Sequence, residues 1–253
     1  MSQFLHHAPC PNCRSKDNLG IWDDHAYCFG CGYQERWDKG LNLERMKYNK
    51  NKDINPNVIS LPLDYNTDLP DIAWAWLNNY GLTIDEVYNY KLGWSESNQR
   101  LIFPVYGQDE ELLFWQGRYL GKDPNQRRKI NKHITRGKSS DILHILGKPD
   151  LDTVVCCEDM ISAIKIARIC PAWCLFGSVL STEALTRASR LYQNLGIYLD
   201  RDKAIYALRA HLRASLYFRS CFTIITEKDP KWYSTEQIRE ILQTHAPNVE
   251  MRV

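Results

Sequence analysis

Short apolar runs alternate with helical stretches over residues 150–253. The runs TVVCC, AWCLF, LGIYL and FTIIT have strand length, and the segments between them, such as MISAIKIARI and TEALTRASRLYQ, show helical spacing of apolar residues. Strands separated by helices pair in parallel through crossover connections. The pattern therefore predicts an α/β fold for this region, with a small doubly wound parallel sheet.

Two further helices are expected in the same region. In KAIYALRAHLRASLYF one stripe is predicted to face the core, and we expect His211 on it to be a core histidine with a hydrogen-bond partner. Ser234 with Gln237 three residues later predicts a capping box that opens STEQIREIL. The remaining members of the stripe are Ala204, Ala207, Leu208, Leu212 and Ser215.

Residues 69–149 mix helices and strands. DIAWAWLNNYG has helical spacing and Gly81 suits its C-terminal stop, while Thr83 and Glu86 form a capping box for a second short helix. RLIFPVYG and ELLFWQGRYLG then read as two strands of a hairpin. We expect a small α+β subdomain here, with the aromatic helical pair contributing to its core.

Residues 39–68 show little periodicity. The stretch KYNKNKDINPN is rich in Asn, Lys and Asp, which is typical of a flexible tether. We therefore predict a linker between an N-terminal segment, residues 1–38, and the two units at 69–149 and 150–253.

Two CxxC pairs mark the N-terminal segment. Cys10 and Cys13 are separated by fourteen residues from Cys28 and Cys31, and the intervening IWDDHAYCF reads as a hairpin. Two such pairs close a tetrahedral Cys₄ zinc site, here a zinc ribbon with one structural Zn²⁺. So short a segment buries little core, and zinc would supply most of its folding free energy, on the order of 10–16 kcal/mol. Disulfides or a redox pair are the alternatives, and His25 would be displayed by the hairpin.

Composition narrows the picture only in places. The net charge of +2 and the 44% hydrophobic share are ordinary for a globular protein, and no apolar run is long enough to span a membrane. Nine cysteines is an odd number, and a disulfide framework would be paired. With no apparent signal peptide, we expect a cytoplasmic protein with no membrane partner, in which the other five cysteines are buried thiols. These are Cys156, Cys157, Cys170, Cys174 and Cys221.

Positive charge is concentrated between residues 118 and 138. Eight basic residues stand there against one acid, Asp123, and such a run is either a solvated face or a track for phosphates. Its place after a β-hairpin favours the track, for which salt-dependent binding is expected. The eight are Arg118, Lys122, Arg127, Arg128, Lys129, Lys132, Arg136 and Lys138.

Acidic residues follow three of the apolar runs in the last domain. Glu158 follows TVVCC, Asp200 closes LGIYLD with Asp202 two residues on, and Asp229 follows FTIIT. Parallel strands bring their carboxyl ends to one edge of a sheet, where α/β proteins bind ligands. Carboxylates gathered there favour Mg²⁺, a hard cation that prefers oxygen ligands. This predicts a metal-dependent site for phosphate chemistry, with Asp200 and Asp202 pointing the same way if the chain stays extended.

The order of these parts resembles the bacterial-type DNA primases, most closely those of phages and of phage primase–helicases. The last domain is similar to the Toprim domain. The resemblance implies an enzyme, a nucleotidyltransferase that makes short RNA primers on single-stranded DNA from nucleoside triphosphates. It implies a zinc ribbon that selects the start site, one or two catalytic Mg²⁺ ions, and a separate replicative helicase and DNA polymerase as partners.

The resemblance also implies residue roles. Glu158 matches the first acid of the family, Asp200 and Asp202 its DxD pair, and Asp229 its third motif. The family often has glycine after the first acid and another acid four residues after it, where this chain has Asp159 and Ser162, so that Asp159 is a further candidate ligand. The residues expected near template or nucleotide are His25, Arg100, Arg118, Arg128, Lys129 and Lys132.

Two other functions are compatible with the pattern. A Toprim-type Mg²⁺-dependent nuclease would need no nucleotides, and a non-catalytic adaptor for single-stranded DNA would use only the ribbon and the basic track. The four acids Glu158, Asp200, Asp202 and Asp229 argue against the adaptor.

Overall fold

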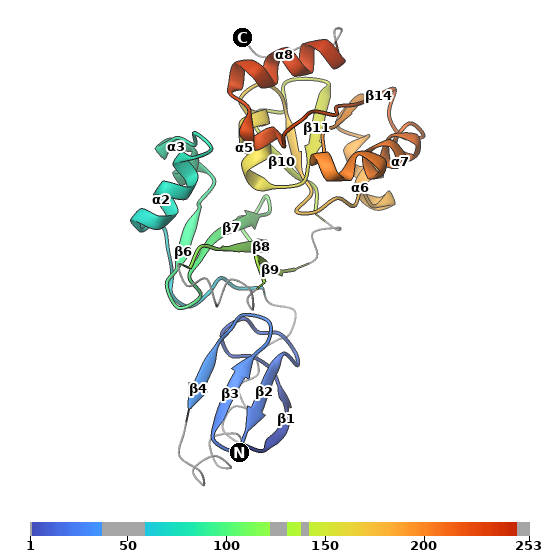
Figure 1. Cartoon of the computed structure of the whole chain (residues 1–253). Coiled ribbons are helices and arrows are strands. Elements are labelled where there is room, and N and C mark those ends of the chain that lie inside the picture. Colours follow the sequence, from blue (N-terminus) through green and yellow to red (C-terminus); the bar gives the residue numbers. More distant parts are fainter. Residues whose placement is uncertain (1, 37–58, 122–130, 138–141, 247–253) are drawn as a thin grey trace. The chain divides into compact units, whose positions relative to one another are not determined.

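The computed structural model describes residues 2–36, 59–121, 131–137 and 142–246 (Figure 1). The chain divides into two compact units. The first contains the described parts of residues 1–74 and 88–137, and the second those of residues 75–87 and 138–253. The last border of the two units lies between residues 137 and 138, before the predicted domain start at residue 150, and the segment Ala75–Val87 belongs with the C-terminal part of the chain.

The N-terminal sheet, blue in Figure 1, has four antiparallel strands in sequence order. Its centre is the predicted hairpin, β2 (Leu19–Trp22) with β3 (His25–Cys28). The outer strands β1 (Phe4–Ala8) and β4 (Gln34–Arg36) were not predicted. Both are almost entirely exposed, so they lack the alternation of apolar and polar residues that reveals a half-buried strand.

The second sheet of the first unit has the order β5-β6-β7-β8-β9, all antiparallel. The predicted hairpin is confirmed as β7 with β8, and the end of the basic segment forms β9. The strands are β5 (Tyr65–Asn66), β6 (Gly93–Ser95), β7 (Arg100–Tyr106), β8 (Leu112–Tyr119) and β9 (His133–Arg136).

The predicted linker is wrong for residues 59–68. Tyr65 pairs with Ser95 across β5 and β6, and the Asp64 carboxylate accepts hydrogen bonds from Ser95 Oγ at 2.8 Å and Ser97 N at 2.7 Å. The segment is thus part of the second sheet. A two-residue strand held by side-chain hydrogen bonds leaves no periodicity in the sequence. Residues 39–58 of the predicted linker lie outside the described residues.

Helices α2 (Asp71–Asn78) and α3 (Ile84–Asn89) occur where they were expected. Gly81 has φ +67°, a left-handed conformation that glycine adopts without strain at the end of a helix. The capping box is formed, with Thr83 N donating to Glu86 Oε2 at 2.8 Å and Glu86 N to Thr83 Oγ1 at 3.2 Å.

The sheet of the second unit has the order β10-β12-β11-β13-β14. Its last four strands are parallel, which confirms the predicted doubly wound sheet. The edge strand β10 is antiparallel to β12, and its three residues were too few to predict. The strands are β10 (His144–Leu146), β11 (Thr153–Cys157), β12 (Ala172–Cys174), β13 (Asn194–Ile197) and β14 (Ser220–Thr223).

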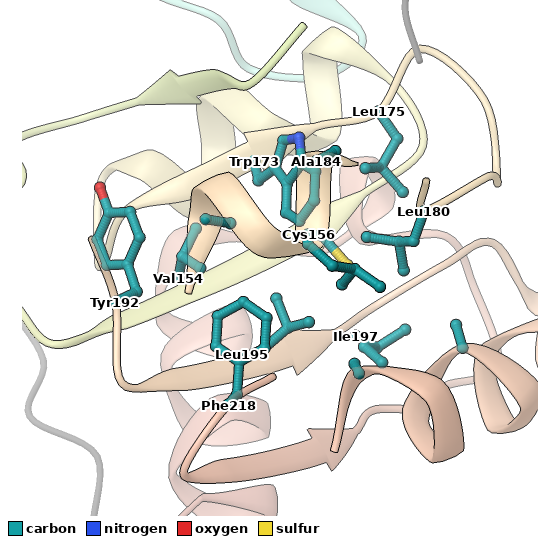
Figure 2. Close-up of a cluster of buried hydrophobic side chains, with 14 of the residues drawn as sticks. Val154, Cys156, Trp173, Leu175, Leu180, Ala184, Tyr192, Leu195, Ile197 and Phe218 are labelled. Atoms are coloured by element: carbon teal, nitrogen blue, oxygen red, sulfur yellow. The ribbon is translucent and has the colours of Figure 1, made fainter. Parts of the chain in front are cut away.

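Helices α5 to α8 connect these strands or follow them. Figure 2 shows side chains of β11, β12 and β13 packed together, with Trp173 and Phe218 among the buried residues. This core fixes the strand ends that carry the acidic residues. The helices are α5 (Met160–Ala167), α6 (Thr182–Ala188), α7 (Ala204–Ala214) and α8 (Thr235–His245), the last with the predicted Ser234–Gln237 capping box.

The predicted stripe on α7 is only partly correct. Ala207 is buried, but Leu208 and Leu212 are 52% and 74% exposed. Small residues, Ala207, Ala210 and Ala214, form the buried face, which lets the helix lie close to the sheet. His211 has a partner as expected, since its Nδ1 lies 3.1 Å from Thr223 Oγ1.

All nine cysteines are free thiols, and the five outside the CxxC pairs are buried or half-buried. Among the described residues, no helix has the length and apolar character needed to cross a membrane.

Candidate functional sites

The four N-terminal cysteines converge. Their sulfur atoms lie within 4.8 Å of one another, with Cys10 Sγ 3.6 Å from Cys31 Sγ and Cys13 Sγ 3.5 Å from Cys28 Sγ. All four are buried. Four thiolates around a Zn²⁺ at about 2.3 Å have similar sulfur–sulfur separations. The cluster therefore fits one zinc ion with four protein ligands, which is a closed, structural site.

Polar groups surround this cluster. Cys13 N donates to Cys10 Sγ at 3.4 Å, a contact typical of a zinc knuckle. Asn12 Nδ2 lies 3.8 Å from Cys31 Sγ and donates to Asn98 Oδ1 at 2.7 Å. Donors of the loop between Cys10 and Cys13 thus reach the ligand sulfurs, and Asn98, in the turn before β7, accepts from Asn12 and holds that loop.

His25 stands in an aromatic group on the ribbon. Its ring stacks on Trp22 with centroids 4.6 Å apart, and its Nδ1 is 2.6 Å from Asp24 Oδ1. Phe4 and Phe29, 46% and 57% exposed, contact the same Trp22. Sequence reasoning placed His25 on the hairpin but missed the aromatic neighbours, which come from three different segments.

The strand-end acids of the second unit come together. Glu158 follows β11, and its Oε1 accepts a hydrogen bond from the backbone N of Asp200, after β13, at 3.1 Å. Asp229 precedes a short 3₁₀ helix, Pro230–Trp232, and its Oδ1 lies 3.5 Å from Arg201 N. The parallel register of β11, β13 and β14 brings these segments to one edge of the sheet.

A lysine lies among the acids. Lys231 Nζ is 3.0 Å from Asp159 Oδ2, 3.3 Å from Asp200 Oδ2 and 2.9 Å from Asp229 Oδ2. Its backbone carbonyl accepts a hydrogen bond from the buried Lys165 Nζ at 2.9 Å. Sequence reasoning quoted Lys231 only as part of a turn, and the signal it missed was a cation two residues after a strand-end acid.

Asp202 takes a different position from the one expected. Asp200 precedes a 3₁₀ helix, Arg201–Lys203, so the chain turns instead of staying extended. The Asp202 side chain is 71% exposed and pairs with Lys203 Nζ at 2.6 Å, whereas that of Asp200 is 21% exposed. The argument that the two point the same way along an extended chain is therefore wrong.

Burial and the repulsion between neighbouring carboxylates raise the pKa values of Glu158 and Asp200. The pKa of Glu158 is raised to about 7, first by burial and then by the charge of Asp200. Burial also raises the pKa of Asp200 to about 6, although Lys231 opposes the change. For Lys231, burial opposes the charge, but Asp159, Asp229 and Asp200 outweigh it and raise its pKa above the ordinary value. The acids thus hold more negative charge than one ammonium group compensates.

This arrangement fits a further cation. Asp200 Oδ1 is buried and has no hydrogen-bond partner. The charges of Asp200 and Asp202 both raise the pKa of Glu158, so the three carboxylates lie near enough to interact. Oxygen ligands of this kind suit Mg²⁺. The carboxylate oxygens of these acids lie further apart than the ligands of one bound ion. Among the described residues, only the four cysteines bring three or more ligand atoms within 4.8 Å of one another.

A depression of about 530 Å³ lies beside the acids. Two of its lining residues are Asp202 and Asp229, and the exposed ring of Trp232 forms part of its wall. It thus joins acidic, basic and aromatic groups next to the candidate metal ligands. The other lining residues are Arg201, Glu227 and Lys228.

The structure describes Arg118, Lys132 and Arg136 of the basic segment. Arg118 and His133 lie on neighbouring strands with Nη1 and Nε2 3.2 Å apart, and Lys132 precedes β9. Arg136 lies over the Trp115 ring at 5.9 Å. Arg128 and Lys129, together with Lys122, Arg127 and Lys138, lie outside the described residues.

Arg100 requires a correction. Its side chain has no exposed surface, so it offers no face to template or nucleotide. Nη1 donates to the carbonyl of Gly117 at 3.0 Å, and Nη2 to that of Asn131 at 2.8 Å. The guanidinium therefore holds the start of β9 against β8. A basic residue at the start of an apolar strand gives no sign of such burial in the sequence.

The fold has relatives among solved structures. The zinc-binding and RNA polymerase domains of Aquifex aeolicus primase match 97% of this chain and 79% of their own, with 13% identity and a TM-score of 0.56. The primase fragment of the bacteriophage T7 primase-helicase protein matches over 96% of this chain and 99% of its own, with 15% identity and a TM-score of 0.52.

A third structure matches a smaller share of the chain. The DnaG primase catalytic domain bound to ssDNA matches 70% of this chain and 73% of its own, with 14% identity and a TM-score of 0.56. No protein-family model and no curated protein sequence matches this chain. At these identities the likeness establishes the fold, which is the predicted one: a four-cysteine ribbon followed by the two-part core found in bacterial-type primases.

Proposed function

We propose that this protein is a DNA primase that joins ribonucleotides into short primers on a single-stranded DNA template. The observation that carries the proposal is the continuity of the fold: ribbon and core match together over 96% of this chain and 99% of the T7 primase fragment. The strand-end acids supply the second support, because joining nucleotides from triphosphates needs metal ions on the phosphates and carboxylates are the ligands that bind Mg²⁺.

Within this proposal the acids have distinct roles. Glu158, Asp200 and Asp202 would hold Mg²⁺, which when bound supplies positive charge to a triphosphate in phosphoryl transfer. Asp229 fixes the position of the Lys231 ammonium through a contact of 2.9 Å and lies 3.5 Å from the Arg201 backbone N. Arg201 and Lys228, at the depression beside the acids, provide positive charge for phosphates.

The ribbon would select the start site on the template. Its aromatic group, with His25 stacked on Trp22 beside the exposed Phe4 and Phe29, is suited to stacking on unpaired bases. Asp24 holds Nδ1 of His25, which leaves Nε2 as the ring nitrogen for a base edge. Arg118, Lys132 and the basic residues at 127–129 would hold the template phosphates. A replicative helicase and a DNA polymerase are the expected partners.

The test is primer synthesis by the purified, zinc-loaded chain with labelled ribonucleotides, Mg²⁺ and a library of single-stranded templates. Labelled products longer than a dinucleotide are expected. Asp202→Ala is expected to abolish joining and to leave DNA binding largely intact. Asp152→Ala is the matched control, because Asp152 stands before β11, at the opposite end of the strand from Glu158. Full activity of Asp202→Ala would overturn the site.

The same reactions separate the two other functions. A Mg²⁺-dependent nuclease would shorten the template when nucleotides are left out. An adaptor would bind the template and make no product, with Asp202→Ala indistinguishable from the unmodified chain in every assay.

A further inference from the structure

The ammonium group of Lys231 has its full set of partners within the acidic cluster. A lysine ammonium carries three N–H donors, and three carboxylates surround this one at 2.9 to 3.3 Å, those of Asp229, Asp159 and Asp200. Each partner comes from a different strand end or helix start. A solvated surface lysine would have neither this number of partners nor a side chain only 18% exposed.

The backbone of Lys231 is held in place by its neighbours in the fold. Pro230 precedes it and is buried, and the Lys231 carbonyl accepts a hydrogen bond from Lys165, a buried residue of α5. Asp159 caps the same helix, its Oδ1 accepting from Ser162 N at 3.0 Å. Cation and acid are thus anchored near the two ends of the same helix, α5, and do not depend on each other alone.

A cation in this position limits the number of divalent ions that the acids can bind. Sites that transfer phosphoryl groups hold one divalent ion or two, and the two ions of a pair lie about 3.5–4 Å apart, close enough to share the two oxygens of one carboxylate. Here Asp159 and Asp229 are engaged by Lys231, as is one oxygen of Asp200. The other oxygen of Asp200, Oδ1, is buried and unpartnered, and the nearby carboxylates outside the Lys231 contacts are Glu158, whose Oε1 accepts from Asp200 N, and Asp202, whose Oδ2 pairs with Lys203. Because Lys231 already occupies Oδ2 of Asp200, that carboxylate has one oxygen for one ion.

We infer that the Lys231 ammonium is a fixed cation of this site that takes the place of a second divalent ion, so that the chain binds a single Mg²⁺ between Glu158, Asp200 and Asp202. Asp159 then serves as a partner of Lys231 and a helix cap, and not as a metal ligand. The inference deepens the proposed function and rests on it only in the choice of Mg²⁺ as the ion.

The test counts divalent ions without any reaction. Mn²⁺ is titrated into the zinc-loaded full chain at pH 8, where Glu158 is ionised, and free Mn²⁺ is read from its electron paramagnetic resonance signal. One bound Mn²⁺ is expected for the unmodified chain and two for Lys231→Met. Lys228→Met, which removes a nearby positive charge at the depression, is expected to keep the count at one.

Three outcomes would overturn the inference: two bound ions, or none, in the unmodified chain, or a count of one in a folded Lys231→Met variant. If that variant does not fold, the count in the unmodified chain decides alone. Primer synthesis is scored separately. A count of one with no primer made would refute the proposed function and keep the role of Lys231, and a count of two with primers made would do the reverse.

Discussion

Arg168 holds Glu86 through two parallel hydrogen bonds, Nε to Oε1 and Nη2 to Oε2, each 2.7 Å long. The same carboxylate closes the capping box of α3 with Thr83. Arg168 Nη2 also donates to the Gly81 carbonyl at 2.8 Å. The segment Ala75–Val87 is thus joined to the C-terminal part of the chain by a paired charge with little exposure, 24% for Arg168 and 16% for Glu86.

Arg168→Met is therefore expected to lower the free energy of unfolding of the second unit by about 2 kcal/mol, because it leaves Glu86 without its charged partner. Urea unfolding followed by circular dichroism measures the change. Arg209→Met, on the exposed side of α7, is the control and is expected to change stability by less than about 0.5 kcal/mol. Equal effects for the two variants would contradict a structural role for the pair.

Zinc removal should unfold one part of the chain and spare the other. The ribbon has few buried residues besides its cysteines, whereas the parallel sheet has a continuous apolar core that needs no metal. Chelation, or Cys31→Ser, is expected to raise amide hydrogen exchange throughout residues 2–36 and leave β11 and β13 protected. Cys221→Ser removes a thiol outside the cluster and should leave both regions unchanged. Protection retained in the ribbon after zinc loss would refute this expectation.

Arg100 and Arg118 should differ in how they affect DNA binding. Arg118→Ala removes a charge from the track and is expected to reduce the salt dependence of single-stranded DNA binding by about 0.7 in log–log slope. Arg100→Met leaves buried carbonyls unpaired and is expected to cost about 2 kcal/mol of stability with an unchanged slope. Fluorescence anisotropy titrations at several salt concentrations measure both. If Arg100→Met lowered the slope of the salt dependence, Arg100 would contact phosphate after all.

His144 predicts a loss of stability in acid. Its Nε2 is buried without a hydrogen-bond partner, and its pairing residue on the neighbouring strand β12 is the buried Cys174. Burial lowers the pKa of His144 to about 4. The unfolded chain therefore binds a proton below the ordinary histidine pKa of about 6.5 that the folded chain does not bind. Stability from this group is complete above about pH 6.5 and decreases by up to about 3 kcal/mol as the pH falls to about 4.

Urea unfolding at pH 5 and pH 7.5 tests the histidine. The unmodified chain should lose more stability between these values than His144→Phe, which keeps the ring packed against Phe176 without a titrating nitrogen. Identical losses would show that other groups set the acid sensitivity.

How much the sequence predicts depends on how local the signal is. The run TVVCC is buried at every position and continues into Glu158, so strand and acid were visible together. The Cys₄ cluster and the capping boxes were predicted because the two cysteines of each CxxC pair, and the two residues of each capping box, stand three positions apart. Arg100 was misjudged since charge in a sequence suggests exposure, and only the carbonyls of residues 117 and 131 explain its burial.

The candidate site shows the same limit. The acids were found from their places after strands, but the turn that separates Asp202 from Asp200 is a tertiary outcome. The cation among them was missed because two of its three partners, Asp159 and Asp200, are distant in the sequence and only the folded sheet brings them to Lys231.

The carboxylate of Asp159 serves two parts of the protein. Oδ1 accepts from the backbone of Ser162 at the start of α5, while Oδ2 accepts from Ser162 Oγ and from Lys231. A substitution of Asp159 would remove the N-terminal cap of α5 and one of the three carboxylate partners of Lys231. The charge around Lys231 and the stability of α5 therefore cannot be changed separately through this residue, and a variant meant to alter the number of bound ions there would need a new cap for α5.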